Sequence, residues 1–294
     1  MKETVNRGLL ITVIALVLVI GLLICKLTKD TTNKDNDATN NSNTQVTDIV
    51  EGAKDFDLNE AEQLLDKFGF KDVLGCNSTK IYDRFYSENY KKIVALNNAF
   101  LQENLKESKK CSDIYNSDNY NEQRGGYVGT IGYGICYKDK EANIISYEDA
   151  NKIFKQMYGY DMTKEGISTI TKKFDYYDYS AKLDEFVSLE CGGCGMVCGP
   201  EQVINITKLK NAYIKNDELI IDVYYHIIDI LEGNGFKYFY TNKSHDTVKL
   251  ESQDLESAKK EVEEKYLDKL DVYEVVFTKK DGNYIFKSVT KKLS

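Results

Sequence analysis

Tryptophan is absent from this 294-residue chain, proline occurs once, as Pro200, and histidine occurs twice, as His226 and His245. A single proline excludes proline-rich recognition segments and favours regular secondary structure. His226 lies within an apolar run typical of a strand, and His245 lies in a turn-like segment. Neither histidine stands in a motif that places a base beside a serine or cysteine nucleophile, so we assign no catalytic residue. The 22 tyrosines and 12 phenylalanines must supply the aromatic part of the core.

Positive charge is also scarce. The chain carries 39 basic and 47 acidic residues, a net charge of −8, and residues 1–29 hold four basic and one acidic side chain. The first 29 residues therefore contribute +3, and the remainder carries −11. An acidic chain without a basic stripe binds DNA, RNA and anionic lipid poorly, because phosphates require the opposite charge. We therefore expect no nucleic-acid partner.

Charge is missing altogether from Gly8 to Cys25, which read GLLITVIALVLVIGLLIC. A helix of this length spans about 27 Å, close to the roughly 30 Å hydrocarbon core of a bilayer. The run lacks the small-residue pattern of a cleaved signal peptide, and the bulky Ile24 before Cys25 disfavours a lipoprotein signal. The sequence predicts a transmembrane anchor over residues 8–27 that contacts membrane lipid.

The anchor divides the chain into unequal parts. Residues 1–7 are too short for a domain and are expected to be a cytoplasmic tail. Six cysteines follow the anchor, which suits an oxidising compartment, although lysine and arginine nearly balance on its two sides. Residues 28–47, rich in Asn, Thr and Asp, predict a disordered linker. Residues 48–294 are expected to form an extracytoplasmic domain at the cell membrane, with any sub-boundary near residues 140–165.

Helical spacing dominates the first part of this domain. Apolar positions three and four residues apart predict helices over residues 58–68 and 82–105, the second broken near Ser87. Ser146 as N-cap, acidic residues in the first turn and Gly159 as a stop predict a third helix over residues 145–158.

Strand patterns dominate the second part. Apolar and β-branched runs predict strands over residues 203–213 and 219–231 and from residue 236, followed by a helix over 255–270. A final hairpin turns at Asp281-Gly282. This order predicts an α+β fold: an N-terminal transmembrane helix, then a helical region, then an antiparallel sheet with helices packed on one face.

The segment Cys191-Gly-Gly-Cys194-Gly-Met-Val-Cys198 allows several interpretations. A redox site or a phosphate-binding glycine loop needs a following helix, which the sequence does not predict. A metal site needs a fourth ligand, which Cys76, Cys111, Cys136 or His226 could supply. We favour a loop cross-linked by disulfides and assign no metal or cofactor. Six cysteines allow fifteen pairings, and the candidates are Cys76, Cys111, Cys136, Cys191, Cys194 and Cys198.

The run Tyr176-Tyr177-Asp178-Tyr179 is the candidate binding surface. Tyr176, Tyr177 and Tyr179 could line a groove for a sugar or peptide. The alternative is an edge strand whose tyrosines alternate between core and water.

Several features together resemble one group of proteins. They are the apolar run, the Asn/Thr/Asp linker, a helix that begins Ile-Ser-Tyr-Glu-Asp-Ala and ends Met157-Tyr158-Gly159, the Cys-Gly-Gly turn, and the final strand Asp-Gly-Asn-Tyr-Ile-Phe-Lys-Ser-Val. This combination resembles the uncharacterised single-pass extracytoplasmic proteins of AT-rich Gram-positive bacteria. The resemblance implies a location and no activity. The element order of the C-terminal half is similar to that of cystatin-like and NTF2-like folds.

These observations predict a membrane-anchored extracytoplasmic binding or envelope-interaction module whose partner is an envelope protein or a glycan. The alternative is an envelope enzyme, either a thiol–disulfide redox enzyme acting through Cys191, Cys194 and Cys198 or a hydrolase. A hydrolase would need a pair of carboxylates, and the sequence does not locate one.

Overall fold

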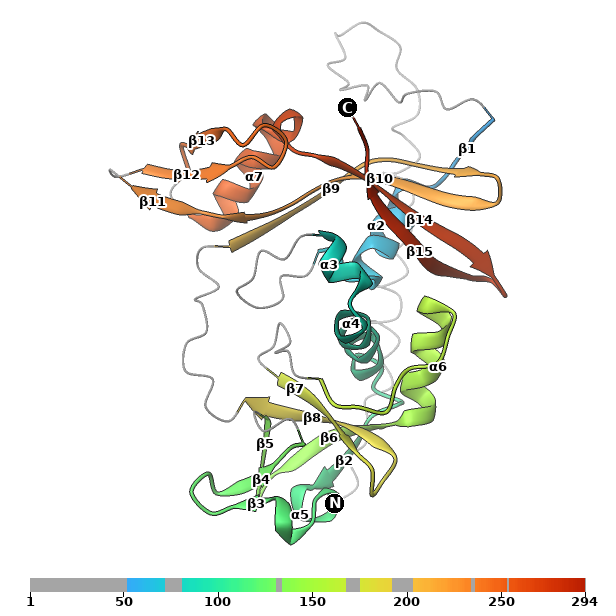
Figure 1. Ribbon diagram of the computed structural model, residues 1–294, viewed down its shortest axis with the longest axis vertical. Helices are drawn as coiled ribbons and strands as arrows, with labels where there is room; N and C mark the ends of the chain where they lie inside the picture. The colour runs from blue at the N-terminus through green and yellow to red at the C-terminus, as the bar shows by residue number, and fades with distance from the viewer. Residues whose placement is uncertain are drawn as a thin grey trace, which may run out of the picture. The chain divides into compact units, whose positions relative to one another are not determined.

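The computed structural model describes residues 52–71, 81–130, 134–167, 175–191, 203–233, 236–252 and 254–293. These residues belong to one compact unit, residues 49–294. The fold is α+β, with antiparallel sheets and few helices (Figure 1). Within the described ranges no helix is long and apolar enough to cross a membrane. The predicted tail, anchor and linker lie outside those ranges.

A five-stranded antiparallel sheet in the order β1-β9-β10-β14-β15 is formed mainly by the C-terminal part of the chain. The apolar run that predicted a central strand is β10, the middle strand, whose Leu219, Ile221 and Val223 are buried on one face. The final hairpin turns at Asp281-Gly282 as predicted. The strands are β1 (Lys54–Asp55), β9 (Val203–Lys215), β10 (Glu218–Asp229), β14 (Val272–Lys280) and β15 (Asn283–Lys291).

Four helices share a core with the Leu219 face of this sheet. The predicted break is confirmed at Ser87, whose side chain caps the second of two consecutive helices. Ser146 caps a later helix, which ends at Gly159 in the left-handed conformation, φ 82°, as a C-terminal glycine allows. The helices are α2 (Leu58–Lys67), α3 (Ile81–Tyr86), α4 (Glu88–Phe100) and α6 (Tyr147–Tyr158).

A second sheet, of seven strands, is formed by residues between 107 and 191. Its strand β8 pairs with β6 and β5 through different halves of its length, and β7 pairs with β8 as well. The strands are β2 (Glu107–Lys110), β3 (Tyr120–Asn121), β4 (Gly126–Val128), β5 (Gly134–Tyr137), β6 (Glu141–Ser146), β7 (Asp175–Ser180) and β8 (Glu185–Cys191), and the short helices α5 (Cys111–Ile114) and η1 (Ser117–Asn119) lie between β2 and β3.

The helices lie between the two sheets, and side chains from all three layers form one central core (Figure 1). Phe68, which follows α2, is 1% exposed. Its ring centroid lies 4.9 Å from that of Phe277 on β14, 6.4 Å from Phe286 on β15 and 5.8 Å from Tyr158 on α6. One side chain therefore joins two helices to the sheet.

Replacing Phe68 tests this packing. Phe68→Ala removes a buried ring and leaves a cavity, so we expect it to lower the free energy of unfolding by about 3–5 kcal/mol. Urea unfolding measures this loss. Leu101→Ala is the control, because Leu101 is 69% exposed and its loss should change stability by less than about 0.5 kcal/mol. Equal effects of the two substitutions would contradict the packing described.

A separate small core lies where the ends of β9 and β10 meet a three-stranded sheet and a helix. Glu261 on the helix is buried, and its carboxylate accepts hydrogen bonds from the Ser252 hydroxyl (2.6 Å) and the Ser252 and Glu251 amides (2.9 and 3.1 Å). Burial raises the pKa of Glu261, but these hydrogen bonds and the charge of Lys265 together outweigh it and lower the pKa overall. The elements are β11 (Leu231–Gly233), β12 (Phe236–Tyr240), β13 (Thr247–Leu250), α7 (Leu255–Lys265) and η3 (Leu267–Lys269).

Because the folded-state pKa of Glu261 is lowered, its stabilisation is present above the ordinary glutamate pKa and is lost as the pH falls through the folded value. We expect Glu261→Gln to cost about 1–3 kcal/mol at pH 7, and the difference from wild type to narrow below the ordinary glutamate pKa. Urea unfolding at a series of pH values measures both effects. Glu264→Gln, an exposed neighbour on α7, should change little. A cost that does not depend on pH would refute the assignment.

Candidate functional site

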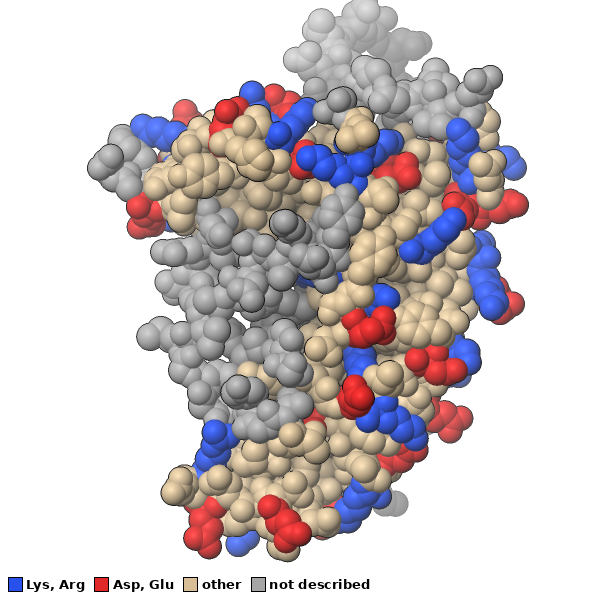
Figure 2. Space-filling model, in the orientation of Figure 1, with Lys and Arg blue, Asp and Glu red and all other residues tan. Residues whose placement is uncertain are grey.

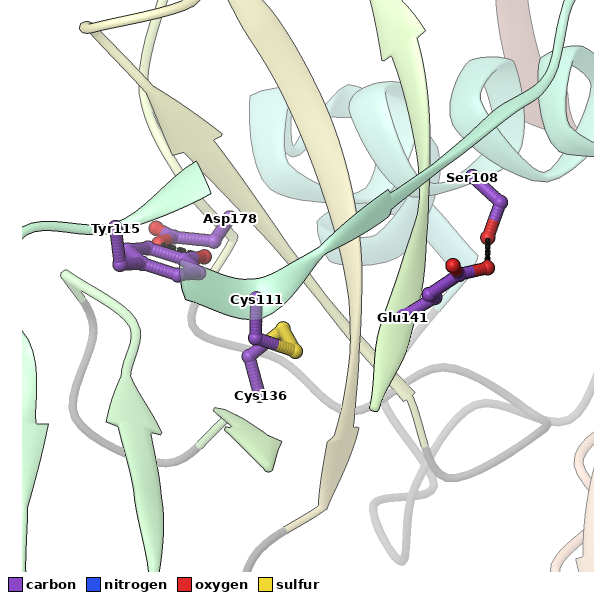
Figure 3. Close-up of a disulfide and its surroundings, with 6 residues drawn as sticks. All are labelled: Ser108, Cys111, Tyr115, Cys136, Glu141 and Asp178. Atoms are coloured by element: carbon purple, nitrogen blue, oxygen red, sulfur yellow. Dashed lines mark hydrogen bonds between the residues drawn. A yellow bond between two sulfur atoms is a disulfide. The ribbon is translucent and has the colours of Figure 1, made fainter. Parts of the chain in front are cut away.

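A disulfide joins α5 to the seven-stranded sheet. Cys111 is the first residue of α5, directly after β2, and Cys136 lies on β5. Their Cα atoms are 5.5 Å apart, and both side chains are buried (Figure 3). The bond closes a loop with a sequence separation of 25. It holds α5 against a third core, which lies on the outer side of the seven-stranded sheet.

A buried carboxylate lies beside the disulfide (Figure 3). Asp178 on β7 accepts a hydrogen bond from the Tyr115 hydroxyl (2.9 Å), from the Thr130 amide (3.1 Å) and from the Thr130 hydroxyl. Burial and the neighbouring Asp178 raise the pKa of Tyr115, so this hydroxyl stays protonated and donates. A Cβ atom on Gly129 would lie 2.9 Å from Asp178 Oδ2, so a glycine is needed there. The carboxylate serves to fasten the residue 129–130 loop and α5 to β7.

Two of the six candidate cysteines, Cys111 and Cys136, are therefore paired with each other. Cys191 ends β8, and its side chain is outside what the structure describes, as are Cys76, Cys194 and Cys198. The interpretations of the cysteine-rich segment as a cross-linked loop, a redox site or a metal site stay predictions. Among the side chains that are described, no group of three or more His, Cys, Asp or Glu could hold a metal ion.

The tyrosine run occupies β7, and two of its side chains are buried in different cores. Tyr176 (7% exposed) packs in the core beside the disulfide. Tyr177 (5% exposed) packs in the central core, stacks on Phe100 and donates to Asn97 Oδ1 at 2.7 Å. Tyr179 is half-buried against the central core. The expectation that Tyr176 and Tyr177 form a binding surface is not met. One face of β7 packs on the central core, and the core beside the disulfide covers the opposite face, which would otherwise be exposed to solvent.

A pocket of about 270 Å³ lies between the C-terminal half of α6 and the turn of the β14–β15 hairpin. Asp281 and Gly282 both have positive φ, 50° and 81°, as a two-residue hairpin turn of type I′ requires. This tight turn brings the ends of β14 and β15 beside the helix. The pocket is lined by Lys152, Lys155 and Gln156 of α6, by Gly159, which caps that helix, and by Lys280, Asp281, Asn283 and Ile285 of the hairpin.

The charges in this pocket are unequal. Three ammonium groups and one carboxylate line it. Lys155 also pairs with Asp161 at 3.1 Å, whereas Lys152 and Lys280 have no ion-pair partner in the described part of the chain. Basic and acidic side chains are interspersed over the face seen in Figure 2. The lining of this pocket therefore carries more positive than negative charge, although the chain as a whole is acidic.

Sequence reasoning missed this site. Each half was foreseen as structure, since the end of α6 at Gly159 and the turn at Asp281-Gly282 were both predicted. Lys152 and Lys280 are far apart in the chain, and no local motif contains both. Only the packing of α6 against β15 brings them together.

The chain was compared with protein families, curated proteins and solved structures. No protein-family model, no curated protein and no solved structure matches the chain. The sites above are therefore interpreted from their own geometry.

Removing the disulfide tests its contribution to stability. A loop of this length predicts that Cys111→Ser with Cys136→Ser lowers the free energy of unfolding by about 3.5 kcal/mol. Urea unfolding without reductant measures the loss. In excess reductant the wild type and the double variant should unfold at the same urea concentration, which controls for the other cysteines. Equal stability without reductant would show that the pair does not stabilise the fold.

Proposed function

We propose that this protein is a membrane-anchored binding module on the extracytoplasmic side of the cell membrane. Residues 8–27 are the anchor, residues 28–47 the spacer, and residues 48–294 the displayed domain. The observation that carries this proposal is the Cys111–Cys136 disulfide inside the folded unit. Disulfides form and persist in oxidising compartments and are rare in the cytosol.

The chemistry of the described sites favours binding over catalysis. Asp178, the buried carboxylate beside the disulfide, is engaged by three hydrogen bonds that fasten a loop. The pocket beside α6 offers ammonium and amide groups, which hold a ligand by charge and hydrogen bonds. Such a pocket suits recognition of a ligand that carries a complementary group.

Thiol labelling of the denatured protein and protease treatment of intact cells together test the location. A variant with Ser at positions 25, 76, 191, 194 and 198 keeps only Cys111 and Cys136. The cells are quenched with acid and the protein is denatured before a polyethylene-glycol maleimide is added. Without reduction we expect no mass shift of the chain. After reduction we expect two maleimide additions per chain. Protease added to intact cells should remove the domain.

A cytoplasmic protein in the same cells is the control for both measurements and should be protected from protease. Two maleimide additions without reductant, together with a domain that protease reaches only after permeabilisation, would place residues 48–294 in the cytoplasm and overturn the proposal.

A further inference from the structure

We propose that the pocket between α6 and the β14–β15 turn, the lysine pocket, binds the phosphate monoester group of a small hydroxylated molecule. The proposal rests on the proposed function as a binding module and names its ligand class. Lys152, Lys155 and Lys280 supply the positive charge, and Gln156, Asp281 and Asn283 supply the polar groups that surround it.

The two lysines without an ion-pair partner in the described residues favour an anion with several acceptor oxygens. Lys155 is shared with Asp161, which leaves the ammonium groups of Lys152 and Lys280 without a carboxylate partner in the described structure. A phosphate monoester carries a charge of about −1.5 to −2 at neutral pH and has three strong acceptor oxygens. Such a group can bridge two ammonium groups from different elements, whereas a monocarboxylate would neutralise only one of them.

The size and remaining groups of the pocket indicate a small polyol or sugar attached to the phosphate. Its volume of about 270 Å³ lies just below the range of about 300–1,000 Å³ that is usual for small-molecule sites. The Asp281 carboxylate can accept hydrogen bonds from ligand hydroxyl groups, and the side-chain amides of Gln156 and Asn283 can donate or accept them. Ile285 gives an apolar wall for carbon atoms.

The charge of the whole chain argues for a small ligand over a polyanion. Its net charge of −8 repels an extended chain of phosphates. A single phosphate group within the pocket experiences mainly the three lysines and the one carboxylate that line it, because exposed charges farther away than about 8 Å are largely screened at physiological salt. The lysine pocket therefore does not contradict the exclusion of nucleic acid.

Calorimetric titration of the full-length protein in detergent tests the proposal with glycerol 3-phosphate as the probe. Glycerol and succinate are the comparison probes, and inorganic phosphate shows whether free phosphate suffices. The test variant is Lys152→Gln with Lys280→Gln. The matched control, Lys260→Gln with Lys269→Gln, makes the same change in net charge at exposed sites on α7 and η3. Unfolding midpoints of both variants should match the wild type.

We expect saturable binding of glycerol 3-phosphate to the wild type and the control. The test variant should lose about tenfold or more in affinity, because it loses two charge-assisted contacts. Comparable binding of inorganic phosphate would support the same chemistry with free phosphate as the source. No saturable phosphate binding, equal binding of succinate, or equal weakening in both variants would overturn the inference. The compartment assigned by thiol labelling does not depend on these results, so the two proposals fail separately.

Discussion

Aromatic packing around Phe68 is the contact on which the arrangement of the layers depends. The rings of Phe68 and Phe286 hold Tyr158, in the last turn of α6, inside the central core. Because Gly159 follows Tyr158 directly, this contact fixes where α6 ends beside β15. The position of the lysine pocket is therefore a consequence of core packing, although all of its lysines are exposed.

The sequence predicted those elements whose signals are local. Ser146 acts as an N-cap because its hydroxyl accepts an amide hydrogen of the first helical turn, and that pattern is visible in the residues themselves. Strand β10 was predictable for the same reason, because its apolar run is visible in the local sequence. By contrast, β2 reads Glu-Ser-Lys-Lys and is mostly exposed, so it has no hydrophobic pattern to reveal it. Its pairing with β6 depends on tertiary contacts.

The candidate sites were less predictable, since each depends on residues that are distant in the chain. Six cysteines allowed fifteen pairings, and the position of Cys111 against β5 selects one pair. The tyrosine run showed the period of a strand correctly, but periodicity cannot tell whether one or both faces are covered. Tyr176 and Tyr177 lie in two different cores because α5 and its disulfide cover the face opposite the helices.

Chain order gives the disulfide a consequence for biogenesis. Cys111 and Cys136 are covered in part by Val187 and Leu189 of β8, a strand that is synthesised after both cysteines. An oxidant in solution reaches buried sulfur atoms only through local opening. Oxidation is therefore easiest while the nascent chain has exposed the two thiols and β8 has not yet docked. Export in the N-to-C direction would provide that interval, so that covalent closure precedes completion of the sheet.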